Sequence, residues 1–295
     1  MMRTLVATAA FLVATCAIAR QPAPPSSTTF DRIKQSGWVR IGFRENTIPF
    51  SFMGAAQPQG YSIDLCRAIA AEISTALGRN LQIEYRRVTP TDRLDQVLAG
   101  RVDLECGSTT ITEERGARVA FSPVIFAAGT RLLVQRGSGI HSLRDLEGKT
   151  VAGVMGTTNA RAMLALGAGR VKNLRITTAD NYEQALALLG TGAVDAVAAD
   201  DILMAGLLSE KGLRSEYLLV GDPLTHEAYG IAFARDDPAL ADAVQKAFTR
   251  LATSGQLRAA YKKWFLEPLP SGAALGLPMN AALEQSFRAL GMPGE

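Results

Sequence analysis

Charged and hydroxyl side chains follow four short apolar segments of the sequence, where strands of an α/β sheet would end. The segments are residues 39–43, 102–106, 150–154 and 193–199, and they are followed by Arg44, Ser108-Thr109-Thr110, Gly156-Thr157-Thr158 and Asp200. Ligands of open α/β sheets bind beyond the carboxyl ends of the strands. The pattern therefore predicts one binding site made by all four segments. For any one of these residues alone, solvation of a loop would be a sufficient explanation.

These residue types suit the two charges of a free amino acid. A guanidinium group and the N–H groups at a helix N-terminus bind an α-carboxylate, and Arg115 and Thr157-Thr158 can supply them. An α-ammonium group needs an anion, for which Asp200 qualifies. Arg44 and Arg93 are left over, so three arginines and one aspartate would give the pocket a charge of +2. Because unpaired buried charge is costly, a ligand with a second carboxylate balances this pocket better than a neutral one.

The elements that must position these residues alternate between strand and helix. Residues 39–106 read as strand, helix, strand, helix, strand, and residues 150–199 repeat that order. This alternation is typical of mostly parallel sheets flanked by helices. We expect two α/β lobes joined by two crossing strands, the first near residues 121–133 and the second near 225–229. The chain would leave lobe I, build lobe II and return, which gives the molecule a hinge.

The N-terminus is typical of an export signal. Met1-Met2-Arg3 is followed by the mostly apolar segment 5–15 and by the cleavage motif Ala17-Ile18-Ala19. We expect cleavage after Ala19 and release into the periplasm. The alternative is a lipoprotein anchored through Cys16, but Thr15 fits that motif poorly.

The remaining boundaries follow from composition and from the crossing segments. We expect a flexible Pro- and Ser-rich leader at 20–29, lobe I at 30–125 and 228–270, and lobe II at 126–227 with hinge segments at its ends. Residues 271–295 would form a tail, with one helix at 281–290 packed on lobe I.

Several classes of function find no support in the sequence. The 295 residues are 20% charged with a net charge of +3, and no run of like charges indicates a nucleic-acid partner. His141 and His226 are isolated, so no histidine metal cluster or Ser-His triad is readable. We expect no catalytic residue, no metal and no cofactor. Cys66 and Cys106 can form a disulfide in an oxidising compartment or remain two buried thiols.

The chain resembles the solute-binding proteins of ABC-type amino-acid importers, and most of all their glutamate/aspartate-binding branch. The resemblance runs from about Thr28 to Pro270. It rests on RIGFRE at 40–45, GYS at 60–62, DLECGSTT at 103–110, GTRLL at 129–133, AYG at 228–230 and KWF at 263–265.

The resemblance implies a set of ligand contacts and a type II, two-lobed periplasmic binding fold. The contacts are Ser108, Thr110, Arg115 and Thr158 to the α-carboxylate, Asp200 to the ammonium group, and Arg44 and Arg93 to a distal carboxylate. Relatives often have a serine at the position of Pro90 and a histidine where Asn181 aligns. Asn181 is therefore the candidate for one further contact to the distal group.

The function that these residues and the resemblance predict is capture, not catalysis. We expect a monomer that closes on an acidic amino acid, L-glutamate or L-aspartate, and delivers it to the membrane permease of an ABC importer. An exported enzyme of the same architecture, such as a dehydratase of a small carboxylate, is the main alternative, because a fold alone does not fix a function. A sensor module is a third interpretation.

Overall fold

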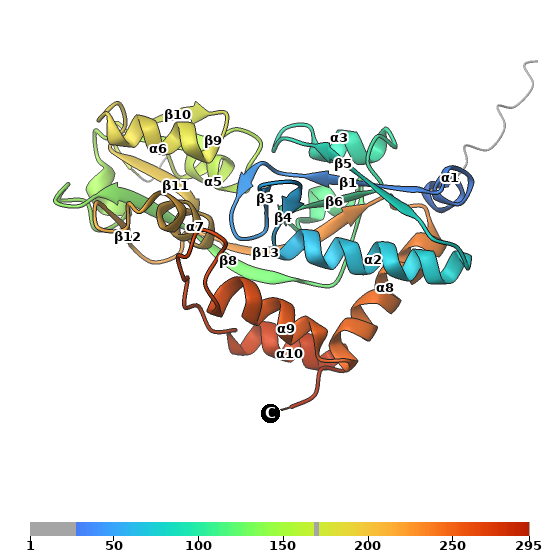
Figure 1. The fold of residues 1–295 in the computed structure, drawn as a ribbon. Coiled ribbons are helices and arrows are strands. Elements are labelled where there is room, and N and C mark those ends of the chain that lie inside the picture. The colour runs from blue at the N-terminus through green and yellow to red at the C-terminus, as the bar shows by residue number, and fades with distance from the viewer. Residues whose placement is uncertain (1–27, 168–170, 295) are drawn as a thin grey trace, which may run out of the picture.

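The computed structural model describes residues 28–167 and 171–294 (Figure 1). The expected export signal, with Cys16, lies outside these residues. Helix α1 (Thr29–Ser36) begins at the last residue of the expected leader, and Thr28 precedes it as the N-cap. Thr28 caps this helix by accepting the N–H of Asp31 at 3.1 Å. Among the described residues, no helix is long and apolar enough to cross a membrane.

Lobe I is built on three parallel strands. Strand β1 (Trp38–Phe43) lies between β5 (Gln82–Arg87) and β6 (Leu104–Thr110). Helices α2 (Tyr61–Leu77) and α3 (Arg93–Leu98) lie on opposite sides of these strands (Figure 1). The apolar residues of α2 recur at helical spacing and are buried, which is why this segment forms a helix against the sheet.

A small sheet that the sequence analysis missed lies between β1 and α2. Its strands are β2 (Asn46–Thr47), β3 (Ser51–Met53) and β4 (Pro58–Gln59), each too short for a recognisable alternation. The Ser51 hydroxyl accepts the N–H of Arg44 at 2.8 Å. The small sheet thus fixes the backbone of the first predicted site residue.

Lobe II repeats the arrangement. Strand β9 (Thr150–Val154) lies between β10 (Arg175–Ala179) and β11 (Ala196–Asp200) and is parallel to both. The flanking helices are α5 (Thr158–Gly167), α6 (Tyr182–Gly190) and α7 (Asp201–Lys211), with the 3-10 turn η1 (Leu143–Leu146) before β9.

Two long antiparallel strands join the lobes. Strand β8 (Phe126–Gln135) pairs through residues 126–129 with β13 (His226–Phe233), and then through residues 130–133 with β11. Beyond its pairing with β8, strand β13 pairs antiparallel with β6 and with β7 (Ala120–Phe121). Strand β12 (Tyr217–Val220) pairs antiparallel with β8. The strand order is therefore continuous, β10-β9-β11-β8-β13-β6-β1-β5. The two lobes form two halves of one sheet that is crossed at β8 and β13.

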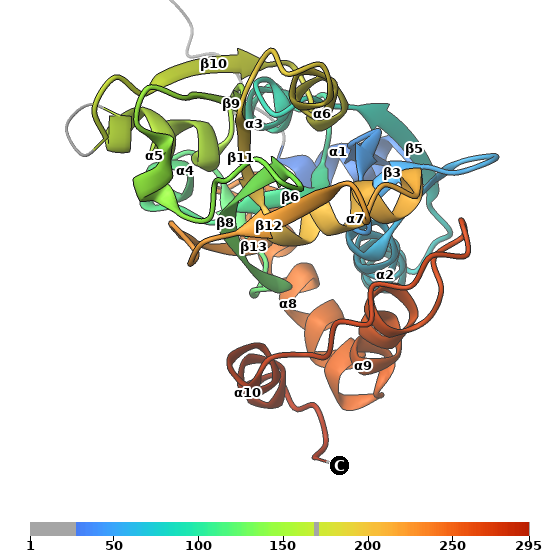
Figure 2. The same ribbon diagram turned by 90° about the vertical axis from the view of Figure 1, so that its left-hand side faces the viewer.

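The C-terminal helices return to lobe I. Helix α8 (Pro238–Thr253) begins with proline, and the capping Asp237 carboxylate also accepts the N–H of Phe30 at 2.7 Å. After α9 (Gln256–Tyr261) and η2 (Lys262–Leu266), the tail ends in α10 (Ala281–Ala289), which lies near α9 in both views (Figures 1 and 2). Leu283 and Phe287 of α10 are buried.

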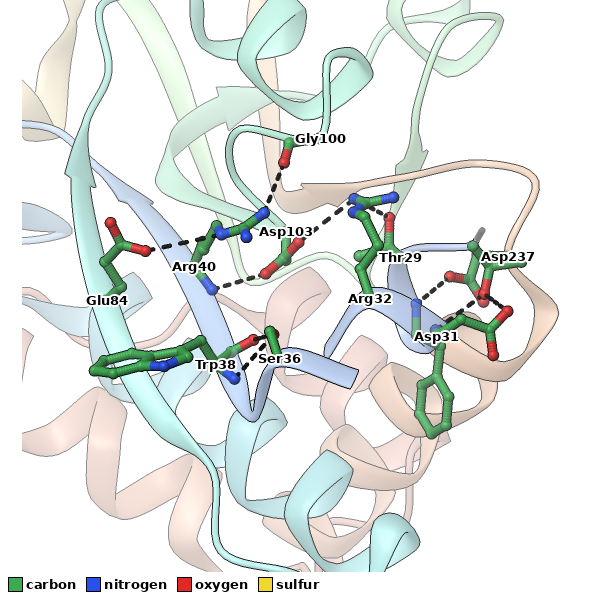
Figure 3. A network of polar contacts seen from close by, with 12 residues as sticks. Thr29, Asp31, Arg32, Ser36, Trp38, Arg40, Glu84, Gly100, Asp103 and Asp237 are labelled. Atoms are coloured by element: carbon green, nitrogen blue, oxygen red, sulfur yellow. Dashed lines mark hydrogen bonds and ion pairs between the residues drawn. The ribbon is translucent and has the colours of Figure 1, made fainter. Parts of the chain in front are cut away.

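A polar network ties α1 to the sheet of lobe I (Figure 3). The Asp103 carboxylate accepts the N–H of Arg40 at 2.8 Å and lies 3.6 Å from the Arg32 guanidinium. The Arg40 side chain reaches Gly100 at 3.1 Å and Glu84 at 3.8 Å. The network holds β1 at the end opposite to Arg44.

A disulfide joins α2 to β6. Cys66 and Cys106 are 40 residues apart in sequence and their Cα atoms are 6.3 Å apart. The residues directly after Cys106 include Ser108 and Thr110, so the bond lies next to the predicted site.

We predict that Cys66→Ala/Cys106→Ala lowers the free energy of unfolding. Opening a loop of 40 residues increases the entropy of the unfolded chain, which corresponds to about 3–4 kcal/mol. Urea unfolding of the purified protein should show this loss, and reducing agent should lower the stability of the parent but not of the variant. Two free thiols in the denatured, unreduced parent would contradict the bond.

Candidate ligand-binding site

Three buried arginines meet at the cleft between the lobes. Arg44 follows β1, Arg93 begins α3, and Arg115 lies in the short helix α4 (Glu113–Gly116). They are only 4%, 3% and 5% exposed, and none forms an ion pair within the described part of the chain. Burial, followed by repulsion from Arg93, lowers the pKa of Arg44 to about 10 and that of Arg115 to about 10. Arg93 therefore lies close enough to repel both Arg44 and Arg115, and these two stay charged at neutral pH.

Arg115 spans the cleft. Its Nη1 donates to the Thr110 carbonyl of lobe I at 2.8 Å, and its Nη2 donates to the Gly156 carbonyl of lobe II at 3.3 Å. Beside it, the hydroxyls of Thr110 and Thr158 are 3.3 Å apart across the same gap. A cavity of about 330 Å³ opens here, and its lining includes Arg93, Arg115 and Gly156.

The N-terminus of α5 offers donors for an anion. The Thr157 hydroxyl accepts the N–H of Ala160 at 3.2 Å and donates its one proton to the Val154 carbonyl at 2.6 Å. The N–H groups of Thr158 and Asn159 have no intrahelical acceptor, and no other described carbonyl or side chain accepts them. Thr157 thus orders the turn, while the next two residues present free donors.

Asp200 ends β11 at the other side of the cleft. It is 3% exposed and accepts the Asn159 Nδ2 at 2.8 Å, but no cation of the described residues pairs with it. Burial raises its pKa to about 7, and the nearby Glu227 carboxylate adds to the rise. An unpaired buried carboxylate of this kind is a natural site for an ammonium group.

Two further buried carboxylates were missed by the sequence analysis. Glu227 of β13 is 2% exposed and Glu105 of β6 is completely buried. If both are ionised, the six buried charges of Arg44, Arg93, Arg115, Asp200, Glu105 and Glu227 cancel. The expected pocket charge of +2 did not include these two glutamates. A signal for Glu105 was present in the sequence, since the other residues of 104–110 are apolar or hydroxyl-bearing.

The structure corrects one predicted position and adds a contact at another. Ser108, Thr109 and Thr110 do not follow the strand but form its last three residues, since β6 extends to Thr110. Asn181 lies at the N-cap of α6, where its Oδ1 accepts the N–H of Gln184 at 2.9 Å. The cap leaves the Asn181 Nδ2 as the remaining donor, and the contact of this side chain to a distal carboxylate stays a prediction. The next residue, Tyr182, is buried, and its pKa is raised mainly by burial and then by Asp200.

The lobes lie in contact in this structure. A Cβ atom at Gly206 of α7 would lie 2.2 Å from the Ile48 carbonyl oxygen, and one at Gly156 would lie 2.7 Å from that of Pro90. Side chains also bridge the lobes, with an ion pair between Arg161 and Glu114. Only glycine permits this approach at both points, so the structure corresponds to a closed form.

Comparison with known proteins defines the class to which this fold and cleft belong. Residues 39–267 match the bacterial extracellular solute-binding proteins, family 3. The chain belongs to this family, and the predicted two-lobed, type II α/β fold is confirmed. A crystal structure of a mutant of ArgBP from T. maritima superposes with a TM-score of 0.71 at 26% identity, covering 81% of this chain and 100% of that one.

Particular relatives carry more specific names. The chain is 35% identical over 261 residues to the L-glutamate/L-aspartate-binding protein of Pseudomonas aeruginosa, covering 87% of this chain and 86% of the relative. It is 33% identical over 281 residues to the glutamate/aspartate import solute-binding protein of Escherichia coli, covering 95% and 92%. These relatives are binding proteins of transporters, so the chain is a solute-binding protein and not an enzyme.

We predict that Gly206→Ala hinders closure without unfolding α7. Alanine is the better helix former, by about 1 kcal/mol, but its methyl group would meet the Ile48 carbonyl. Small-angle scattering at saturating L-glutamate should give a larger radius of gyration for the variant than for the parent. Gly116→Ala is the control, because no described atom lies within 4 Å of a Cβ there. Equal radii for Gly206→Ala and the parent would show that α7 does not limit closure.

Proposed function

We propose that this protein captures an acidic amino acid, L-glutamate or L-aspartate, in the periplasm and delivers it as a monomer to the membrane permease of an ABC importer. The observation that carries the proposal is the separation of unpaired buried charge in the cleft. Arg93 repels Arg44 and Arg115 on one side, whereas Glu227 repels Asp200 on the other. The names of the relatives in Pseudomonas aeruginosa and Escherichia coli support the ligand class.

Each charge of such a ligand has a matching group. The α-carboxylate would bind Arg115 and the free N–H groups of Thr158 and Asn159, where guanidinium and helix terminus act together. The ammonium group would bind Asp200. The distal carboxylate would bind Arg44 and Arg93, which relieves the repulsion between them. Each charge of the ligand would therefore be matched by a group of opposite charge beside it.

Capture and closure would be one process. The α-carboxylate bridges Arg115 of lobe I and α5 of lobe II, so a ligand that joins both lobes stabilises the contacts at Gly156 and Gly206. Rotation about β8 and β13 would bring the lobes together. The closed surface is then what a permease can distinguish from the open one.

We predict that the arginines divide into a general and a selective group. Losing one partner of a buried charge pair costs about 2–5 kcal/mol, or roughly 30-fold to several thousand-fold in affinity. Arg115→Met should weaken glutamate, aspartate and glutamine alike, because all share the α-carboxylate. Arg44→Met and Arg93→Met should weaken glutamate and aspartate strongly and spare glutamine.

Calorimetric titration of the three ligands measures this division. Arg144→Met is the control, since Arg144 is exposed in lobe II. If Arg44→Met and Arg93→Met both leave glutamate and aspartate binding intact, the acidic ligand class is wrong.

We predict that affinity declines as pH falls below about 7. An ammonium ligand needs ionised Asp200, whose pKa in the empty protein is raised to about 7, so each pH unit below that value should cost up to about tenfold in affinity. Above pH 7 the affinity should level off. The raised pKa also means that the empty folded state holds a proton that the unfolded chain releases above about pH 4. This group therefore favours folding less and less as pH rises from 4 to 7.

Titrations from pH 5 to 8.5 test both statements. Asp200→Asn should bind weakly and lose this pH dependence, whereas His226→Gln, which removes the nearest histidine in sequence, should keep it. A parent protein whose affinity stays constant from pH 5 to 8.5 would refute the assignment of the ammonium group to Asp200.

A further inference from the structure

Glu227 is a buried carboxylate at the hinge, and threonine hydroxyls surround it. It lies in the crossing strand β13, is 2% exposed, and forms no ion pair within the described residues. Two hydroxyls donate to it, Thr225 at 2.5 Å to Oε1 and Thr158 at 2.7 Å to Oε2, and the Thr130 hydroxyl oxygen lies 3.3 Å from Oε1. A buried charge that only neutral groups satisfy leaves a net negative charge in the hinge.

The hydrogen bonds around Glu227 have a fixed direction. A hydroxyl has one proton, and Thr225 gives its proton to the carboxylate. In the 2.5 Å contact between Thr130 and Thr225, Thr130 must therefore be the donor if a bond forms. The Thr130 oxygen is then free to accept the Asn159 Nδ2 at 2.6 Å. In this series of hydrogen bonds, Asn159 donates to Thr130, Thr130 donates to Thr225, and Thr225 donates to Glu227.

This direction fixes the amide of Asn159. Its Nδ2 donates to both Thr130 and Asp200, so a flipped amide would place its oxygen against a carboxylate. The Asn159 Oδ1 consequently remains without a partner, although the residue is only 1% exposed. An unpaired buried acceptor beside Asp200 is suited to a second N–H of an ammonium group.

Assigning the single proton of each hydroxyl also changes the role of Thr158. Its proton goes to Glu227 at 2.7 Å, so its oxygen accepts from the Thr110 hydroxyl in the 3.3 Å contact. The Thr158 side chain therefore has no proton left for a ligand carboxylate. Its N–H at the start of α5 remains as the donor.

We infer that Glu227 is a positioning residue of the ammonium subsite, which acts from the hinge strand by orienting Asn159 and by adding negative charge beside Asp200. The inference rests on the proposed function only in that the ligand is an amino acid. The other charged or titratable groups that face this pair are Arg115, Tyr182, Asp201 and Tyr229.

The variant Glu227→Gln tests this role. An amide donates as well as accepts, so it would compete with Thr225 or Thr158 and disturb the chain that fixes Asn159. We expect binding of L-glutamate to weaken by roughly 10- to 100-fold, the range for a hydrogen bond to a charged group. Glutarate has both carboxylates but no ammonium group, so its affinity should not fall.

A pH profile separates this role from a packing defect. Glu227 contributes to the raised pKa of Asp200, so Glu227→Gln should move the decline of glutamate binding to lower pH. Thr225→Val removes a link of the chain but keeps the charge. It should weaken glutamate binding with an unchanged pH profile. Glu210→Gln, an exposed charge removal in α7, should alter neither property.

The measurements are calorimetric titration with glutamate and with glutarate, and thermal unfolding of every variant. Equal losses for glutamate and glutarate in a folded Glu227→Gln protein would overturn the inference, as would an unshifted pH profile. If the parent binds glutamine instead of glutamate, the acidic ligand class fails. The role of Glu227 is then tested by comparing the binding of glutamine with that of its analogue without the amino group. If the parent binds no amino acid, both proposals fall.

Discussion

The structure depends on keeping charges buried that have no partner within the chain. Arg44, Arg93, Arg115 and Asp200 are each at most 5% exposed, yet no ion pair joins them among the described residues. Leaving such charges unpaired in a protein interior is costly, so they persist only where a rigid frame holds them. That frame is the pair of sheet halves, with the disulfide behind β6 and the small sheet behind Arg44. The rigidity of the two lobes therefore permits these charges to stay buried at the cleft.

The crossing strands divide the frame at a defined place. Phe126 of β8 and Tyr229 of β13 pack against Phe50 of lobe I, each with ring centroids 5.1 Å apart. These aromatic contacts fix one end of the crossing to lobe I. Beyond them β8 continues as Ala127-Ala128-Gly129, and a side chain at Gly129 would meet Pro223 at 2.9 Å. Small residues thus lie where the strands must bend for the lobes to move.

Most of the fold and half of the site chemistry could be predicted from the sequence, for physical reasons that differ between residues. Apolar periodicity and glycine stops located the major strands and helices, because burial itself produces those patterns. Strand ends located Arg44 and Asp200, because parallel strands place their carboxyl ends at one edge. Glu227 and Glu105 lie inside strands, where their burial depends on partners distant in sequence, Thr158 among them. Asn181 differs from them, since its Oδ1 makes a local helix cap that is readable three residues along the sequence.

The position of Glu227 connects the hinge to the chemistry of the cleft. Its backbone pairs with Ala128 in the crossing strands, and its side chain accepts the Thr158 proton from lobe II. Thr158 also contacts Thr110 of lobe I, with the two hydroxyl oxygens 3.3 Å apart, so Glu227 is linked to lobe I when the lobes are closed.

Opening the lobes would separate that hydroxyl pair. The hydrogen bonds from Thr130 to Thr225 and from Thr225 to Glu227 would remain, because they lie within the hinge and lobe II. The orientation of Asn159 beside Asp200 would therefore survive opening, and the proposed ammonium subsite would be formed before closure. The proposed carboxylate subsite is different, because Arg115 and α5 come from different lobes and contact each other across the closed cleft. With the ligand contacts as proposed, lobe II would hold the ammonium group first, and closure would then complete the contacts to the carboxylates.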